Sequence, residues 1–135
     1  MNKIIKCNDL NITIYIEDTD FQGFVYHANY LKFFERARSD FLSSNKISQK
    51  NLRINNLAFV VKKINLNYVS AAELGDDLII KTSVEKKSDA RMIFSQKIIN
   101  LSNKNFVDGT IDICLINLIT KKPQKFPDDL LLIFE

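Results

Sequence analysis

One long segment of this sequence has the apolar spacing of a helix, and the segments around it have the spacing of strands. In residues 28–43, apolar side chains recur at intervals that place them on one helical face. These side chains are Tyr30, Phe34, Ala37 and Phe41. Residues 10–16, which precede the helix, alternate between apolar and polar side chains as a strand does. The later segments with the same alternation are residues 63–68, 78–84, 92–98 and 106–118.

Short polar turns separate the later strands, with the sequences AELGDD, KKSDAR and LSNKN. Turns of this length are typical of antiparallel neighbours. The polar stretch SSNKISQKNLRINN, after the helix, reads as a connection with room for a turn of helix. Pro123 and Pro127 mark the region where the last strand ends. The sequence therefore predicts an α+β fold in which one long helix packs on the apolar face of an antiparallel sheet.

The length of 135 residues suits a single domain, and we expect residues 1–135 to form one. No apolar run approaches the ~20 residues of a membrane span. The N-terminal residues have no continuous apolar core of the kind found in signal peptides. A soluble, cytoplasmic protein is therefore expected. The net charge of +3 comes from scattered lysines, which argues against nucleic-acid binding but suits an anionic small ligand.

Composition also excludes several kinds of site. With 3 glycines the chain has no phosphate-binding loop and no dinucleotide fingerprint. A single histidine rules out a His-rich metal site. Cys7 and Cys114 lie too far apart for metal-type spacing, and we interpret them as small buried apolar side chains. We therefore expect no metal and no cofactor.

The stretch EDTDFQGFVYHANY, residues 17–30, places Asp20 seven residues before His27, at the entrance to the helix. A helix N-terminus offers unpaired N–H groups, which can hold a carbonyl oxygen as it becomes an oxyanion. A nearby carboxylate can attack that carbonyl or take a proton from water. Gly23, between the two residues, lets the backbone turn closely around a substrate. This arrangement suits acyl transfer to water.

The longer stretch YIEDTDFQGFVYHANYLKFFERARSDFL resembles the signature of the YbgC-type acyl-CoA thioesterases, in the hotdog-fold group that includes 4-hydroxybenzoyl-CoA thioesterase. That signature reads D-x-D-x-x-G-x-V-Y-H-x-x-Y, followed by E-R-A-R on the helix. Residues 68–82, YVSAAELGDDLIIKT, are similar to a second family motif, with Ala71 where a proline is usual. Phe21 and Gln22 also depart from the family pattern, because small residues are common at their positions.

The resemblance implies a hotdog fold, in which a sheet wraps the long helix and two subunits pair to form the active sites. It implies an acyl-CoA substrate and a homodimer or homotetramer. It makes Asp20 the catalytic carboxylate, and it makes the His27 backbone N–H the donor that polarises the thioester carbonyl. The family's substrate-binding positions fall on Gly23, Val25 and Tyr26, of which the first two shape the loop. The open sheet, with its strand at residues 106–118, has an edge that such pairing would cover.

Other interpretations of the same residues stay open. Asp20 can be a turn residue only, and His27 can contribute only its backbone. Glu35 is an alternative catalytic acid, although Arg38, three residues on, favours a structural ion pair. Asp18 is interpreted as structural. The alternative function is a hotdog module that binds acyl-CoA or acyl carrier protein within an envelope or lipid-synthesis complex without turnover. A dehydratase on the same fold is a third hypothesis.

Overall fold

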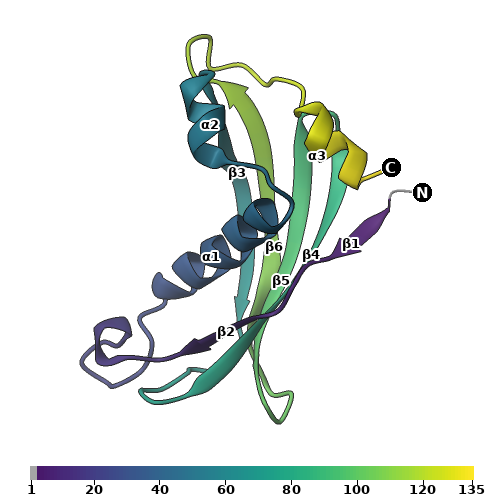
Figure 1. Ribbon diagram of the computed structural model, residues 1–135. Helices are drawn as coiled ribbons and strands as arrows, with labels where there is room; N and C mark the ends of the chain where they lie inside the picture. Colours follow the sequence, from purple (N-terminus) through teal and green to yellow (C-terminus); the bar gives the residue numbers. More distant parts are fainter. Residues whose placement is uncertain (1–2) are drawn as a thin grey trace.

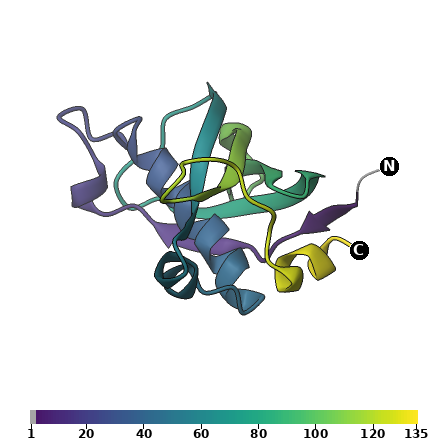
Figure 2. The ribbon, with the colours of Figure 1, turned by 90° about the horizontal axis from the view of Figure 1, so that it is seen from above.

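The computed structural model describes residues 3–135, in which a six-stranded antiparallel sheet curves around one long helix (Figure 1). The chain begins with β1 (Ile4–Lys6), β2 (Leu10–Thr13) and a short 3₁₀ helix (Ile16–Asp18). The helices α1 (Asn29–Ser44) and α2 (Gln49–Ile54) follow. The remaining elements are β3 (Leu57–Tyr68), β4 (Asp77–Ser88), β5 (Arg91–Asn100), β6 (Asn105–Asn117) and α3 (Asp128–Ile133). β1 and α3 lie near each other at one end of the molecule (Figures 1 and 2), and Lys3 Nζ donates to the Glu135 carbonyl oxygen at 3.1 Å.

The predicted elements are present, but some differ in extent and two short elements were not predicted. The first predicted strand ends at Thr13 instead of residue 16. Ile14 is buried, but Ile16 is 76% exposed because the chain turns into the 3₁₀ helix there. β3 begins at Leu57, ahead of its predicted alternation. β1 and α3 were not predicted, since a three-residue strand and a six-residue helix are too short to show a period.

The order of strands in the sheet corrects one prediction about turns. β4, β5 and β6 are consecutive antiparallel neighbours, as their short turns predict. The AELGDD turn does not join neighbours, because β3 pairs with β6, and β4 lies beyond β5. Residues 69–76 therefore cross three strand spacings, which is ~14 Å. Eight extended residues can reach up to ~26 Å, so a short connection suffices for the crossing.

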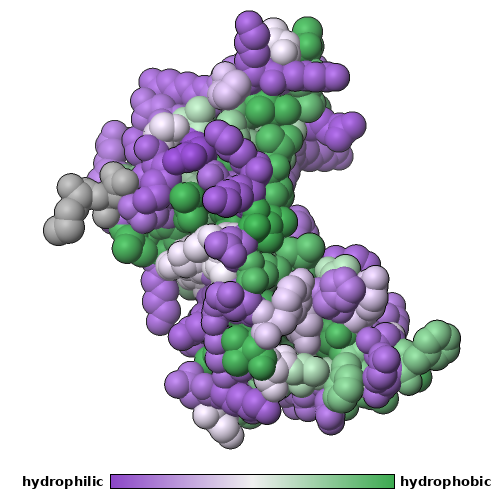
Figure 3. All heavy atoms as spheres, turned by 180° about the vertical axis from the view of Figure 1, so that it is seen from behind, coloured by the Kyte–Doolittle hydropathy of each residue, from purple (hydrophilic) through white to green (hydrophobic). Residues whose placement is uncertain are grey.

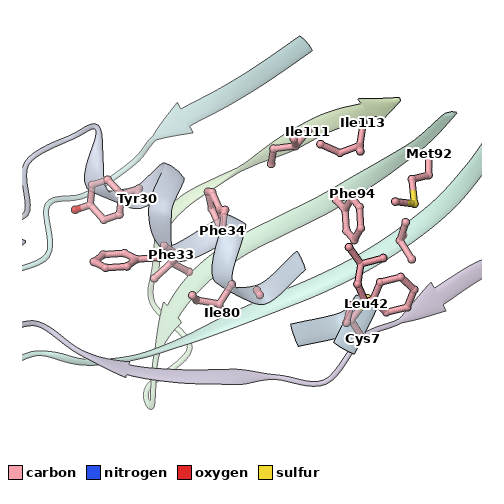
Figure 4. Packing of buried hydrophobic residues seen from close by; sticks show 14 of the residues in the cluster. Cys7, Tyr30, Phe33, Phe34, Leu42, Ile80, Met92, Phe94, Ile111 and Ile113 are labelled. Carbon is pink, nitrogen blue, oxygen red and sulfur yellow. The ribbon is translucent and has the colours of Figure 1, made fainter. Parts of the chain in front are cut away.

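The core lies between α1 and the sheet. All four residues of the predicted helical stripe are buried, and Phe33 and Leu42 of α1 are buried beside them. Figure 4 shows Phe34 and Phe94 pointing into the space between the helix and the strands, and both are at most 1% exposed. A single helix enclosed by one antiparallel sheet is the α+β hotdog arrangement, and the predicted fold class is confirmed.

β3 is an edge strand, which corrects the expectation that residues 106–118 lie at the edge. β6 lies inside the sheet between β5 and β3. On β3, Val61 is 48% exposed and Ile64 is 40% exposed. Figure 3 shows a vertical apolar strip over this strand. An unpaired edge with apolar side chains is a surface that favours pairing with another chain.

β3 and β6 approach each other closely at Gly109, which faces Leu66 in the register of the two strands. A Cβ atom built on Gly109 would lie 2.1 Å from the Asn65 carbonyl oxygen and 2.9 Å from the Leu66 Cα. Because both contacts are with backbone, the neighbouring strand could not move aside without breaking the pairing. Only glycine fits at this position.

Cys7 and Cys114 are free and buried, as their interpretation predicts. Burial raises the pKa of the Cys7 thiol to about 12, which keeps it protonated at neutral pH. Among residues 3–135, no three His, Cys, Asp or Glu side chains gather as metal ligands would. Within the same residues, no helix combines the length and apolar character needed to cross a membrane.

Candidate active site

The segment between the 3₁₀ helix and α1 folds back on itself in a tight loop. The Asp20 N–H donates to the Phe24 carbonyl oxygen at 2.9 Å, and the Gly23 N–H donates to the Asp20 carbonyl oxygen at 3.0 Å. Gly23 has a φ of 81°, a left-handed conformation that glycine adopts without steric cost. The tight turn expected at Gly23 is therefore present, and it holds Asp20 within the loop.

The connection between β3 and β4 fastens this loop from the other side. The Val25 N–H donates to the Ala72 carbonyl oxygen at 2.8 Å, and the Ala72 N–H donates to the Tyr30 hydroxyl at 3.0 Å. The Gly75 N–H donates to the Ile14 carbonyl oxygen at 2.9 Å. The two motifs found in the sequence thus lie side by side. Val25 is 5% exposed, so it shapes the loop from within the core.

The Asp20 carboxylate is partly buried and is oriented by its neighbour Gln22. Its Oδ1 accepts the Gln22 backbone N–H at 2.9 Å. Turned so that its nitrogen faces the acid, the Gln22 side-chain amide donates to both carboxylate oxygens, at 2.8 and 3.1 Å. Asp20 therefore has a turn role, and its carboxylate is also held in a fixed orientation. Asp18 is structural, as predicted, because its Oδ2 accepts the Tyr15 N–H at 2.9 Å.

The N-terminus of α1 presents backbone donors. The residue before the helix is Ala28, which has no side chain able to cap it. The Asn29 N–H donates to the Tyr26 carbonyl oxygen at 2.8 Å. In contrast, the N–H groups of His27 and Ala28 have no acceptor within residues 3–135. These two groups are available to a substrate oxygen, and the helix dipole favours developing negative charge at the same place.

Aromatic side chains surround this helix end. The exposed His27 imidazole lies against the Tyr26 ring, with 4.5 Å between ring centroids, and edge-on to Tyr68 at 6.3 Å. The Tyr68 hydroxyl donates to the His27 carbonyl oxygen at 3.3 Å. Tyr26 is 47% exposed, so its ring is accessible to a bound molecule. Tyr68 ties the end of β3 to the helix entrance, a contact that the sequence did not indicate.

Tyr30, which the sequence suggested was only a core residue, also reaches this region. Burial raises the pKa of the Tyr30 phenol, and the Ala72 N–H bond lowers it in part. The negative charges of Asp76 and Asp20 raise the pKa further. The phenol therefore stays neutral, and the Asp20 carboxylate lies within electrostatic range of it. The signal in the sequence was the closing tyrosine of the H-x-x-Y motif.

The prediction of an ion pair between Glu35 and Arg38 is wrong, because each side chain has another partner. Glu35 accepts a hydrogen bond from the Ser39 hydroxyl at 2.6 Å. Arg38 Nη1 donates instead to Gln96 Oε1 at 3.1 Å, because its side chain turns inward toward β5. Glu35 also lies eight residues beyond His27 along the chain, which is ~12 Å of helix rise. The alternative acid is thus distant from the donors at the helix N-terminus.

Comparisons with known proteins identify the family of the chain. The sequence model of the thioesterase-like superfamily matches residues 14–134. The chain is 33% identical to the acyl-CoA thioester hydrolase YbgC of Escherichia coli, over 92% of each chain. It is 37% identical to the acyl-CoA thioesterase YbgC of Haemophilus influenzae, over 87% of each. A crystal structure of a probable thioesterase from Bartonella henselae superposes with a TM-score of 0.82 at 35% identity, covering 89% of this chain and 98% of that one.

Proposed function

The chain belongs to the thioesterase-like superfamily, and from this premise we propose that it hydrolyses acyl-CoA thioesters to a free acid and coenzyme A. One observation on the structure of this chain supports the proposal beyond its family membership. A fixed carboxylate, that of Asp20, lies in one loop with two backbone N–H donors that have no acceptor in the described part of the chain, and the second motif fastens this loop. Attack on a thioester carbonyl requires both kinds of group.

In the proposed reaction the carbonyl oxygen accepts a hydrogen bond from the His27 N–H. The Asp20 carboxylate then attacks the carbonyl carbon, or it takes a proton from a water molecule that attacks. Negative charge develops on the carbonyl oxygen, where the donors and the dipole of α1 stabilise it. When the intermediate collapses, the carbon–sulfur bond breaks and the thiolate of coenzyme A leaves and takes up a proton. If Asp20 is the nucleophile, water subsequently cleaves the mixed anhydride.

The remaining predicted site residues have distinct roles in this proposal. Gly23 and Val25 hold the loop in shape through the turn and the bond to Ala72. Tyr26 presents an exposed ring beside His27, where it can pack against the substrate. The imidazole of His27 is exposed and has no hydrogen-bond partner within residues 3–135, so the backbone of this residue carries its main role.

A panel of acyl-CoA thioesters tests the function and separates it from the binding-module alternative. We expect steady release of free thiol over many turnovers, without added metal and in the presence of EDTA. Tight binding of acyl-CoA with no turnover on any member of the panel would support the binding module instead. A loss of activity with EDTA that a divalent ion restores would contradict the proposed metal-free reaction. We also propose that this reaction takes place in the cytoplasm.

We also propose that the protein is a homodimer or homotetramer in which a second copy covers the edge of β3. The exposed Val61 and Ile64 side chains lie on an edge strand whose outer side has no partner in residues 3–135. Pairing two such edges would satisfy their backbone groups and bury both apolar strips. Sedimentation at micromolar concentration is expected to show a dimer or larger species. A stable, fully active monomer would contradict this proposal.

A further inference from the structure

Tyr68 joins the end of β3 to the peptide that leads into α1. Its hydroxyl donates to the His27 carbonyl oxygen at 3.3 Å. That carbonyl belongs to the same peptide unit as the Ala28 N–H, which is one of the two donors that have no acceptor among residues 3–135. The contact of Tyr68 therefore bears directly on a group that is available to a substrate oxygen.

The geometry of a peptide links the two ends of this unit. The peptide between His27 and Ala28 is trans, and a trans peptide is planar with its carbonyl and its N–H on opposite sides. A donor that holds the His27 carbonyl on one side therefore directs the Ala28 N–H to the other side. The hydrogen bond also draws electron density toward the carbonyl oxygen, which makes the N–H of that peptide a stronger donor.

The preceding peptide, between Tyr26 and His27, is held in the same way by the backbone. The Asn29 N–H donates to the Tyr26 carbonyl oxygen at 2.8 Å, which fixes the direction of the His27 N–H. The two available donors thus belong to consecutive peptides, and each peptide accepts a hydrogen bond at its carbonyl. One of these bonds is local, and the other comes from a side chain 41 positions away along the chain.

Tyr68 is itself held firmly enough to orient a peptide. The Val69 N–H, next along the chain, donates to the Phe106 carbonyl oxygen at 2.9 Å. The Tyr68 ring lies 5.9 Å from that of Tyr30, centroid to centroid. Tyr30 is 3% exposed, and its hydroxyl accepts the Ala72 N–H at 3.0 Å. All these contacts lie within one chain.

We propose that Tyr68 is a positioning residue, whose hydroxyl orients the peptide between His27 and Ala28 so that the Ala28 N–H is a second donor to the thioester oxygen. This inference rests on the proposed thioesterase function. As negative charge develops on the substrate oxygen, the bond from Ala28 strengthens, and the polarised carbonyl then accepts the bond from Tyr68 more strongly.

The length of the Tyr68 bond agrees with a role in the transition state. At 3.3 Å it is longer than the ~2.7–2.8 Å that is usual for a hydroxyl donor. Catalytic hydrogen bonds are often long without substrate and shorten in the reacting complex. An interaction that is stronger in the transition state than in the bound substrate raises kcat and leaves KM unchanged.

Tyr68→Phe removes only the hydroxyl and tests this role. We expect kcat on an acyl-CoA thioester to fall ~5–10-fold, the effect of one hydrogen bond, which is less than the ~10²–10³-fold cost of losing an oxyanion donor itself. KM is expected to stay within about twofold of wild type, as is the Kd of a non-hydrolysable analogue with a methylene group in place of the thioester sulfur. Tyr15→Phe makes the same change at a tyrosine that is 63% exposed, and this matched control should keep wild-type values.

A second measurement does not depend on turnover. The amide nitrogen resonance of Ala28 in a nuclear magnetic resonance spectrum responds to a hydrogen bond at the carbonyl of its own peptide, because that bond changes the electron density on the nitrogen. We expect this resonance to move in Tyr68→Phe and to stay in place in Tyr15→Phe. The melting temperature and the sedimentation of Tyr68→Phe should match those of the wild-type protein.

The outcomes separate this proposal from the broader one. Wild-type kcat in Tyr68→Phe, or a higher KM at constant kcat, contradicts the positioning role and leaves the proposed function intact. A lower kcat together with a lower melting temperature or a changed assembly shows a structural residue and also contradicts it. If the wild-type protein hydrolyses no thioester, the proposed function fails. The Ala28 resonance then decides whether Tyr68 orients this peptide, since an unchanged resonance contradicts that contact and a moved one supports it.

Discussion

Replacement of Asp20 with asparagine is expected to lower kcat on an acyl-CoA thioester by ~10²–10⁴-fold, or ~3–5 kcal/mol of barrier. Asparagine has nearly the same shape and can still accept the Gln22 N–H, so the loop should keep its conformation. It cannot attack a carbonyl or take a proton from water. Turnover should therefore fall while circular dichroism and the melting temperature stay close to wild type.

Two companion variants make this result specific. Glu35→Gln changes the alternative acid on α1 and is expected to keep most activity, because Glu35 is far from the helix N-terminus and bonds Ser39. His27→Ala keeps the backbone donor, so we expect a smaller loss than for Asp20→Asn. If Asp20→Asn folds normally with wild-type turnover and Glu35→Gln abolishes activity, the acid is on the helix and the proposed roles are wrong.

Replacement of Gly109 with alanine is expected to destabilise the protein by about 3 kcal/mol, at the upper end of the usual cost of overpacking. The new Cβ would lie 2.1 Å from the Asn65 carbonyl oxygen and 2.6 Å from a Leu66 methyl carbon. The methyl group can turn away, but the carbonyl oxygen belongs to the backbone of β3. To relieve the contact, β3 must separate from β6 along the edge of the sheet.

Chemical denaturation of Gly109→Ala measures this effect. Thr110→Ala, at the next residue of β6, is the control, because Thr110 is exposed and its change should stay within about 0.5 kcal/mol. Equal stability of the two variants would contradict the close approach of the strands. Since β3 is also the proposed pairing edge, we expect Gly109→Ala to weaken self-association.

The sequence predicted best the elements in which apolar side chains recur on one face over many residues. The helical stripe that ends at Phe41 is buried as expected, since a 16-residue helix shows its apolar face several times over. The position of β3 could not be read in the same way. A turn of given length is compatible with a hairpin or with a short crossing, and only the pairing of β3 with β6 decides between them.

The sequence likewise predicted the part of the candidate site that lies in one short stretch and missed the contacts between distant residues. Asp20, Gly23 and His27 lie within one short stretch, so a local motif was enough to single them out. The contacts of Tyr68 with His27 and of Arg38 with Gln96 join residues 41 and 58 positions apart. A local pattern in one sequence cannot indicate a contact between positions so far apart in the chain. The failed Glu35–Arg38 ion pair has the same cause, because a partner on β5 replaced the neighbour on the helix.

The fastening of the site loop by the β3–β4 connection has a consequence for the order of events during synthesis. As the chain leaves the ribosome, the loop and the start of α1 emerge first, but Ala72, the partner of Val25 and Tyr30, follows 42 to 47 residues later. β6, which completes the sheet around β3, emerges later still. The nascent chain must therefore carry an exposed amphipathic helix until most of the protein has been made. Contacts between distant positions of this kind slow folding and lengthen the interval in which chaperones can bind α1.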